Sequence, residues 1–213
     1  MKQLETILEK LDRPGIMGRE RYFHAVVLVP FVEIDSQQYI VLEKRAPKIR
    51  QGGEVSFPGG GYEKSDKNIF ATAVRETSEE LGIDPKYIHP FKQFDSIINP
   101  LGSLIDVVIG KIDPEAIKHF TPNSAEVDKI ILVPWKWLQD NKPQEYKLQV
   151  EIHSSGEDDT GKKIIHFPAK ELGIPARYHK SWKGHAHKVY AWQYDGETIW
   201  GVTAEILVEL LKV

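Results

Sequence analysis

The chain has 213 residues, of which 41% are hydrophobic and 10% aromatic, and a formal net charge of −3 at pH 7. This length and apolar content suffice for one substantial core, so we expect a single domain over residues 1–213. The charge gives no basic footprint for nucleic acid, and no stretch reads as a membrane span. The lack of cysteine excludes disulfides, thiolate zinc sites and a cysteine nucleophile.

The first residues show an amphipathic helical pattern, with Leu4, Ile7, Leu8 and Leu11 on one side. We therefore expect residues 1–20 to form an N-terminal helical extension. Charged residues interrupt the segment, and it does not resemble a secretory signal. A cytoplasmic location is expected on this basis.

Runs rich in β-branched and aromatic residues are typical of strands and alternate here with helical patterns. The expected strands are residues 24–31, 39–43, 94–98, 105–112 and 130–133. A helix is expected over residues 67–81, with Asp66 as N-cap and Gly82 as a left-handed C-terminal residue. A short helix after Pro134 and a closing helix over residues 198–211 complete an α/β fold with a sheet between helices.

Residues 141–191 read as an insertion in the C-terminal half of the chain. The alternating runs LQVEIH and KKIIHF flank the turn-rich SSGEDDTG, a pattern that predicts a β-hairpin. A lid over the site and a contact in a homodimer are the two roles that this hairpin could have.

The most informative stretch is residues 57–83, FPGGGYEKSDKNIFATAVRETSEELGI, in which a glycine turn precedes a helix. Glu76, Glu79 and Glu80 fall on one stripe of that helix, which we expect to face outward, away from the apolar stripe. Carboxylates this close repel one another unless a cation binds, and oxygen ligands suit Mg²⁺ or Mn²⁺. Arg75 is four residues before Glu79, so we assign it an orienting role.

This stretch resembles the Nudix box, Gly-x5-Glu-x7-Arg-Glu-U-x-Glu-Glu-x-Gly-U, where U is bulky and apolar. The matching residues are Gly61, Arg75, Glu76, Glu79, Glu80, Gly82 and Ile83. Thr77 and Lys67 depart from the pattern, and Lys67 replaces the first glutamate, for which Glu63 or Asp66 could stand in. The resemblance implies a Nudix α/β/α sandwich with a mixed sheet, and it carries over Glu76, Glu79 and Glu80 as metal ligands.

The preceding segment, residues 41–60, resembles the extra signature of coenzyme A diphosphatases in the Nudix superfamily. Arg45, Arg50, Gly53, Phe57, Pro58, Gly59 and Gly60 carry this match. It implies that Gly59 and Gly60 line the substrate, and that Arg45, Lys48 and Arg50 form a cationic patch for the separate ribose phosphate of coenzyme A.

The implied reaction is metal-dependent hydrolysis of the diphosphate in coenzyme A or acyl-coenzyme A, with Mg²⁺ or Mn²⁺ as cofactor. Glu126, just before the strand at residues 130–133, is our candidate for a further ligand or the general base. Two alternatives stay open. One is a Nudix hydrolase of another nucleoside diphosphate derivative, such as ADP-ribose or a dinucleotide, and the other is a Nudix-fold binding module without turnover, motivated by Lys67.

Overall fold

The computed structural model describes residues 16–213. The expected helical extension therefore falls almost wholly outside the described residues. Its described end includes a short 3₁₀ turn, η1 (Arg19–Arg21), which leads into the first strand. None of the helices within residues 16–213 is long and apolar enough to cross a membrane.

The centre of the molecule is a seven-stranded mixed sheet. Strands β7, β2, β1, β6 and β5 follow one another across it, β3 pairs with β2 on the same edge as β1, and β4 also pairs with β1. Among the strand pairs of residues 16–213, only β1 and β6 are parallel. The strands are β1 (Phe23–Ile34), β2 (Gln37–Arg45), β3 (Val55–Ser56), β4 (Gly59–Gly61), β5 (Ile88–Ile98), β6 (Ser103–Ile112) and β7 (Val127–Pro134). All five expected strands are confirmed within β1, β2, β5, β6 and β7.

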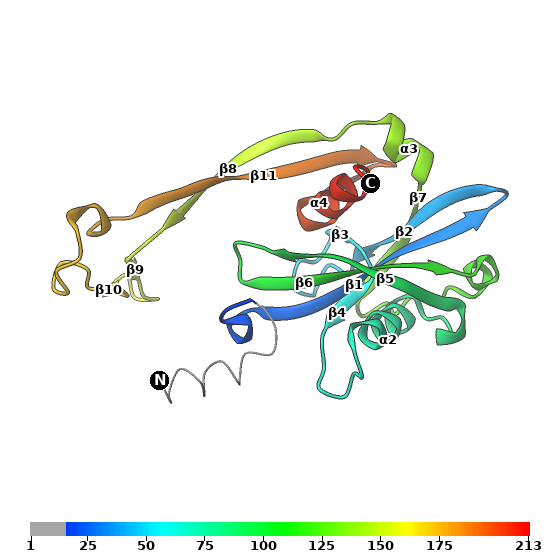
Figure 1. Cartoon of the computed structure of the whole chain (residues 1–213), viewed down its shortest axis with the longest axis horizontal. Coiled ribbons are helices and arrows are strands. Elements are labelled where there is room, and N and C mark those ends of the chain that lie inside the picture. The colour runs from blue at the N-terminus through cyan, green and yellow to red at the C-terminus, as the bar shows by residue number, and fades with distance from the viewer. Residues whose placement is uncertain (1–15) are drawn as a thin grey trace, which may run out of the picture.

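One helix covers each face of this sheet, so the expected α/β/α sandwich is confirmed (Figure 1). Helix α2 (Ile69–Leu81) packs on the face formed by Val26, Leu28, Val41 and Val108. Helix α4 (Gly201–Leu210) packs on the other face, where Val29, Leu42 and Val107 belong to the second core cluster. Alternation along each strand supplies both cores, because successive side chains point to opposite faces.

Helix boundaries differ in two places from the expected ones. The N-cap of α2 is Asn68, whose side chain accepts a hydrogen bond from the Ala71 amide, because Asp66 is engaged elsewhere. The expected closing helix begins only at Gly201, since residues 197–200 form strand β12 (Glu197–Trp200) after a tight turn at Asp195 and Gly196. Gly82 ends α2 in the left-handed region as expected, and the short helix after Pro134 is confirmed as α3 (Trp135–Asp140).

The insertion forms a long arm that projects from the body (Figure 1). Strand β8 (Gln144–Ile152) pairs antiparallel with β11 (Trp182–Tyr194), which also pairs with β12 near the body. The expected hairpin is therefore wrong in its partners, because LQVEIH pairs with β11 and not with KKIIHF. A smaller hairpin at the tip joins β9 (Ser155–Glu157) to β10 (Lys163–Ile165), so three residues of the expected turn are strand. The 3₁₀ turns η2 (Pro85–Tyr87), η3 (Pro114–His119) and η4 (Ala176–Tyr178) complete the fold.

Candidate active site

The acidic side chains of helix α2 divide between two environments. Glu80 is buried against the sheet with 5% of its surface exposed, whereas the Glu79 side chain is 56% exposed. The expectation that all three carboxylates face outward is therefore wrong. The helix turns Glu76 and Glu80 toward β4, where three glycines leave room for polar side chains in place of an apolar contact.

The glycine turn packs directly against these carboxylates. The Gly59 amide donates a hydrogen bond to Glu80 Oε2 at 2.7 Å. A Cβ at Gly60 would lie 2.5 Å from the Glu76 carboxylate, and a Cβ at Gly59 would lie 2.3 Å from the Val26 carbonyl oxygen. Gly59 also has a φ of +152°, which side chains other than glycine rarely adopt. The glycines are therefore needed because the backbone itself forms one wall of the site.

Arg75 donates hydrogen bonds to three carboxylates, one of which is its expected partner Glu79. Its Nε and Nη2 donate to the two carboxylate oxygens of Asp66 at 3.1 and 3.0 Å. Its Nη1 donates to Glu76 at 2.9 Å and to Glu79 at 3.3 Å. Hydrogen bonds from Arg75 lower the pKa of Asp66 to about 2. Asp66 thus orients the arginine, and this role differs from the expected substitution for the first box glutamate at Lys67.

Glu43 on β2 is a functional candidate that the sequence analysis missed. Its side chain is fully buried, and its Oε2 has no hydrogen-bond partner among the described residues. Its Oε1 accepts only a long contact, 3.5 Å, from the Ser56 hydroxyl. A buried carboxylate oxygen without a partner is costly. The alternation of side chains along β2 could have predicted this, because Glu43 lies on the same face as Val41, which packs against α2, at the end of an apolar run.

The carboxylates of Glu43, Glu76, Glu80 and Glu126, which we call the acidic cluster, act on one another electrostatically. Burial raises the pKa of Glu43 and of Glu80 well above the usual range, and each neighbouring carboxylate adds to the rise. Burial also raises the pKa of Glu76, against the opposing hydrogen bond from Arg75. The charge of Glu126, an exposed loop residue, adds to the rise in pKa at all three.

The basic segment lies at the same end of the sheet. The positive charge of Arg45 opposes the rise in pKa at Glu43 and Glu80, which places the guanidinium near the acidic cluster. Arg45 Nε donates to the Arg50 carbonyl at 3.3 Å, and the Ala46 amide donates to the Glu126 carbonyl at 2.8 Å. Lys48 and Arg50 are exposed on the loop that follows.

The predicted metal ligands meet only in part. Glu76 and Glu80 both contact the glycine turn, whereas Glu79 pairs with Arg75 on the exposed side. Within residues 16–213, no group of three or more His, Cys, Asp or Glu side chains is arranged closely enough to hold an ion. The donor chemistry nevertheless fits a divalent cation, because the unpartnered Oε2 of Glu43 and the crowded Glu80 carboxylate are hard oxygen donors that an ion would neutralise.

Comparison with protein families identifies the class of this chain as a hydrolase of pyrophosphate bonds. The chain belongs to the NUDIX domain family, whose model matches residues 22–151. Nudix hydrolases generally use divalent metal ions. The expected family, fold and enzyme class are therefore confirmed.

Two curated relatives and one solved structure are similar to this chain. The chain is 30% identical over 190 residues to an uncharacterised Nudix hydrolase, NudL, of Photorhabdus laumondii, a match that covers 89% of this chain and 83% of the relative. It is 32% identical over 133 residues to the mitochondrial coenzyme A diphosphatase NUDT8 of Homo sapiens, covering 60% of this chain and 55% of that one. The crystal structure of a Nudix hydrolase from M. smegmatis, RenU, has a TM-score of 0.45 at 21% identity and covers 56% of this chain and 74% of its own.

Proposed function

We propose that this Nudix hydrolase cleaves the diphosphate of coenzyme A or acyl-coenzyme A, releasing 3′,5′-ADP and phosphopantetheine or its acyl form. The proposal rests mainly on one observation: the acidic cluster and the basic residues 45–50 lie at the same end of the sheet. The acidic cluster lies beside the Gly59–Gly61 strand, and residues 45–50 continue from the same strand that carries Glu43. A diphosphate with a separate ribose phosphate needs both groups.

Acidic side chains are proposed to hold the metal ion and to activate water. Glu43, Glu76 and Glu80 are the carboxylates that would hold Mg²⁺ or Mn²⁺, and Glu79 can join them if it leaves Arg75. Such an ion, when bound, neutralises phosphate oxygens and activates water. Arg75 keeps Glu76 in place through the 2.9 Å hydrogen bond. Glu126 is exposed to solvent water and its charge acts on the cluster, which suits a general base or a further ligand.

The substrate is oriented by backbone and by basic side chains. Gly59 and Gly60 let the turn pack tightly against β1 and the Glu76 carboxylate, so the diphosphate would lie along backbone at this wall. Arg45, near the cluster, is suited to the diphosphate. The exposed Lys48 and Arg50 are suited to the ribose 3′-phosphate, since a guanidinium binds phosphate oxygens through two parallel hydrogen bonds and an ammonium follows as a mobile charge. The coenzyme A diphosphatase among the relatives supports the same substrate.

The test is product analysis with pure protein. We would incubate it with Mg²⁺, and separately with Mn²⁺, against coenzyme A, dephospho-coenzyme A, ADP-ribose and a dinucleoside polyphosphate, and separate the products by chromatography. Formation of 3′,5′-ADP from coenzyme A as the preferred reaction is expected. Selective cleavage of ADP-ribose or the dinucleotide would replace the proposed substrate with that alternative, and saturable binding without any product would contradict turnover by this chain.

A further inference from the structure

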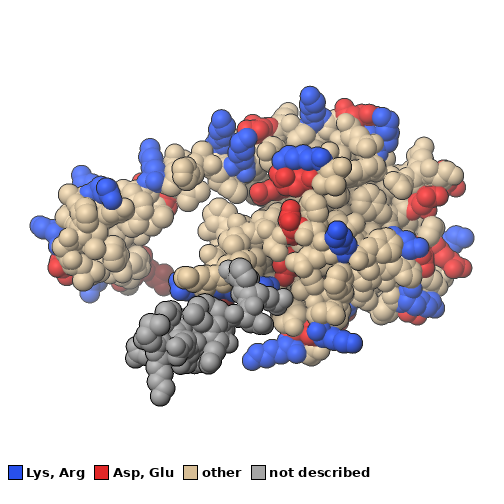
Figure 2. Space-filling model, viewed as in Figure 1, with Lys and Arg blue, Asp and Glu red and all other residues tan. Residues whose placement is uncertain are grey.

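The outer edge of strand β8 has no pairing partner within residues 16–213. Its other edge pairs with β11 along most of its length, and the local sheet runs β12, β11, β8, so that β8 is its last strand. The arm stands clear of the body in the space-filling view, with an open space between them (Figure 2). Alternate amide and carbonyl groups of β8 therefore face solvent, ready to pair with another strand.

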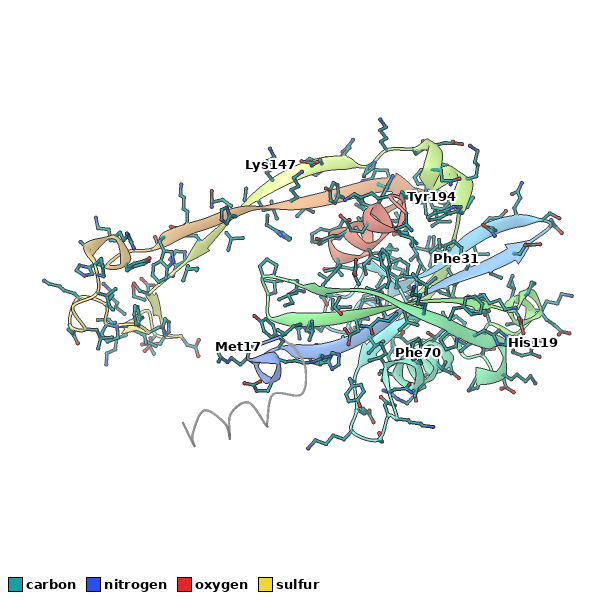
Figure 3. All side chains as sticks on the ribbon, viewed as in Figure 1. Met17, Phe31, Phe70, His119, Lys147 and Tyr194 are labelled. Carbon is teal, nitrogen blue, oxygen red and sulfur yellow. The ribbon has the colours of Figure 1, made fainter. Side chains whose placement is uncertain are left out.

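The arm carries an apolar face that is largely exposed among the residues that the structure describes. On β8, Tyr146, Leu148, Val150 and Ile152 alternate with polar residues, and about half of the surface of Tyr146, Leu148 and Ile152 is exposed. Val189 lies opposite Tyr146, and Trp182 lies opposite Ile152 on β11, so both strands contribute to this face. The ribbon extends well beyond its root near Tyr194 (Figure 3), and a two-stranded ribbon is marginally stable alone.

The charges along β8 match a second copy of the same strand. In an antiparallel pair centred on Gln149, Lys147 lies opposite Glu151 of the second copy, and the two-fold axis repeats this pair. The same register sets Leu148 opposite Val150 on the apolar face. Registers centred nearer the start of β8 set like charges opposite each other. With Leu148 at the axis, Glu145 of one copy lies opposite Glu151 of the other. With Lys147 at the axis, the two Lys147 side chains lie opposite each other.

We infer that the chain forms a two-fold homodimer through the β8 edges of two arms, with Gln149 at the axis. The two three-stranded sheets then join into one continuous sheet, and backbone hydrogen bonds satisfy both free edges. This inference rests on the arm alone and does not depend on the substrate proposed above.

Charge reversal tests both the dimer and its register. Lys147→Glu places glutamate against Glu151 twice, and Glu151→Lys places lysine against Lys147 twice, so each variant is expected to weaken the dimer at least about tenfold. The double variant restores two opposite-charge pairs and is expected to restore the dimer. Lys163→Glu, on the exposed β10 at the tip, is the matched control and is expected to leave it unchanged. Analytical ultracentrifugation over a range of concentrations gives the dissociation constants.

A second measurement fixes the contact point. The chain has no cysteine, so Gln149→Cys introduces a single thiol whose nearest equivalent is its own symmetry mate. A short bis-maleimide is expected to link Gln149→Cys chains into dimers much faster than Asp159→Cys chains, whose thiol lies in the tip turn. A wild-type protein that stays monomeric throughout, a dimer indifferent to Lys147→Glu, or equal linking of both cysteine variants would overturn the inference.

Discussion

Glu80 and Gly59 are 21 residues apart in the chain and are joined by a 2.7 Å hydrogen bond from the Gly59 amide to the Glu80 carboxylate. This contact fixes helix α2 against the glycine turn. It also brings the buried carboxylate of Glu80 to the end of β2, where Glu43 lies and the basic segment begins. The helix and the turn therefore work as one unit, and disturbing either should affect the same chemistry.

Replacement of Gly59 by alanine should damage the fold itself. The new Cβ would overlap the Val26 carbonyl oxygen, a backbone atom that cannot move aside, and the φ of +152° adds strain. We expect a loss of at least about 2 kcal/mol in the free energy of unfolding. Gly61→Ala is the matched control in the same strand, because its Cβ would meet only the Phe23 ring at 3.5 Å. Equal denaturant midpoints for the two variants would refute the steric argument.

The carboxylates of α2 should be essential to turnover but not to folding. Glu79→Gln and Glu80→Gln each remove a charge from the proposed metal site, and we expect each to lower kcat/KM by about a hundredfold or more. Glu209→Gln, on the exposed side of α4, serves as control. Circular dichroism should show the same fold in all three. Near-normal rates in both site variants would rule out the metal assignment.

Asp66 should stabilise the fold above its unfolded pKa. Arg75 lowers the folded-state pKa of Asp66 from 3.8 to about 2, so the folded protein binds fewer protons than the unfolded chain in this window. The stabilisation is complete above about pH 4 and disappears as the pH falls through about 2. Asp66→Asn should therefore cost about 1 to 2 kcal/mol near neutrality and less in acid. Urea unfolding at several pH values measures the difference, and a constant penalty across that range would contradict the charged role.

Glu43 should behave in the opposite sense. Burial raises its folded-state pKa far above the unfolded value of 4.5, so the folded protein binds more protons and loses stability as the pH rises above about 4.5. Glu43→Gln should raise the melting temperature of metal-free protein at pH 7.5 and have less effect at pH 5. The same variant should respond less to added Mg²⁺ in a thermal shift assay, since binding to the native state stabilises it. An unchanged Mg²⁺ response would exclude Glu43 from the metal site.

Local patterns in the sequence predicted most of the fold because the signals were strong. Alternation and β-branched residues marked the five strands, and Gly82 marked the end of the box helix. The N-cap differed because Asn68 and Asp66 are both good caps, and only the tertiary pairing of Asp66 with Arg75 decides between them. The arm was misread because strand partners depend on the distant β11 and not on the nearest run with the right alternation.

The site residues that belong to the helix motif could be predicted from the sequence. The residues that join the site through packing of the sheet could not. Arg75 met its expected partner Glu79 because the two are one helical turn apart. The direction in which Glu80 points depends on the missing side chains of β4, and spacing within the helix cannot show this. Glu43 joins the cluster through the packing of β2 beneath α2, so no local pattern places it next to Glu80.

The most direct test of the proposed function is the preference for coenzyme A over dephospho-coenzyme A in wild-type protein and in Lys48→Ala/Arg50→Ala. We predict that wild type has a kcat/KM at least about tenfold higher for coenzyme A, and that the double variant loses this preference while it keeps its rate on dephospho-coenzyme A. Equal values for the two substrates in wild type, or an unchanged preference in the variant, would contradict recognition of the 3′-phosphate by this loop.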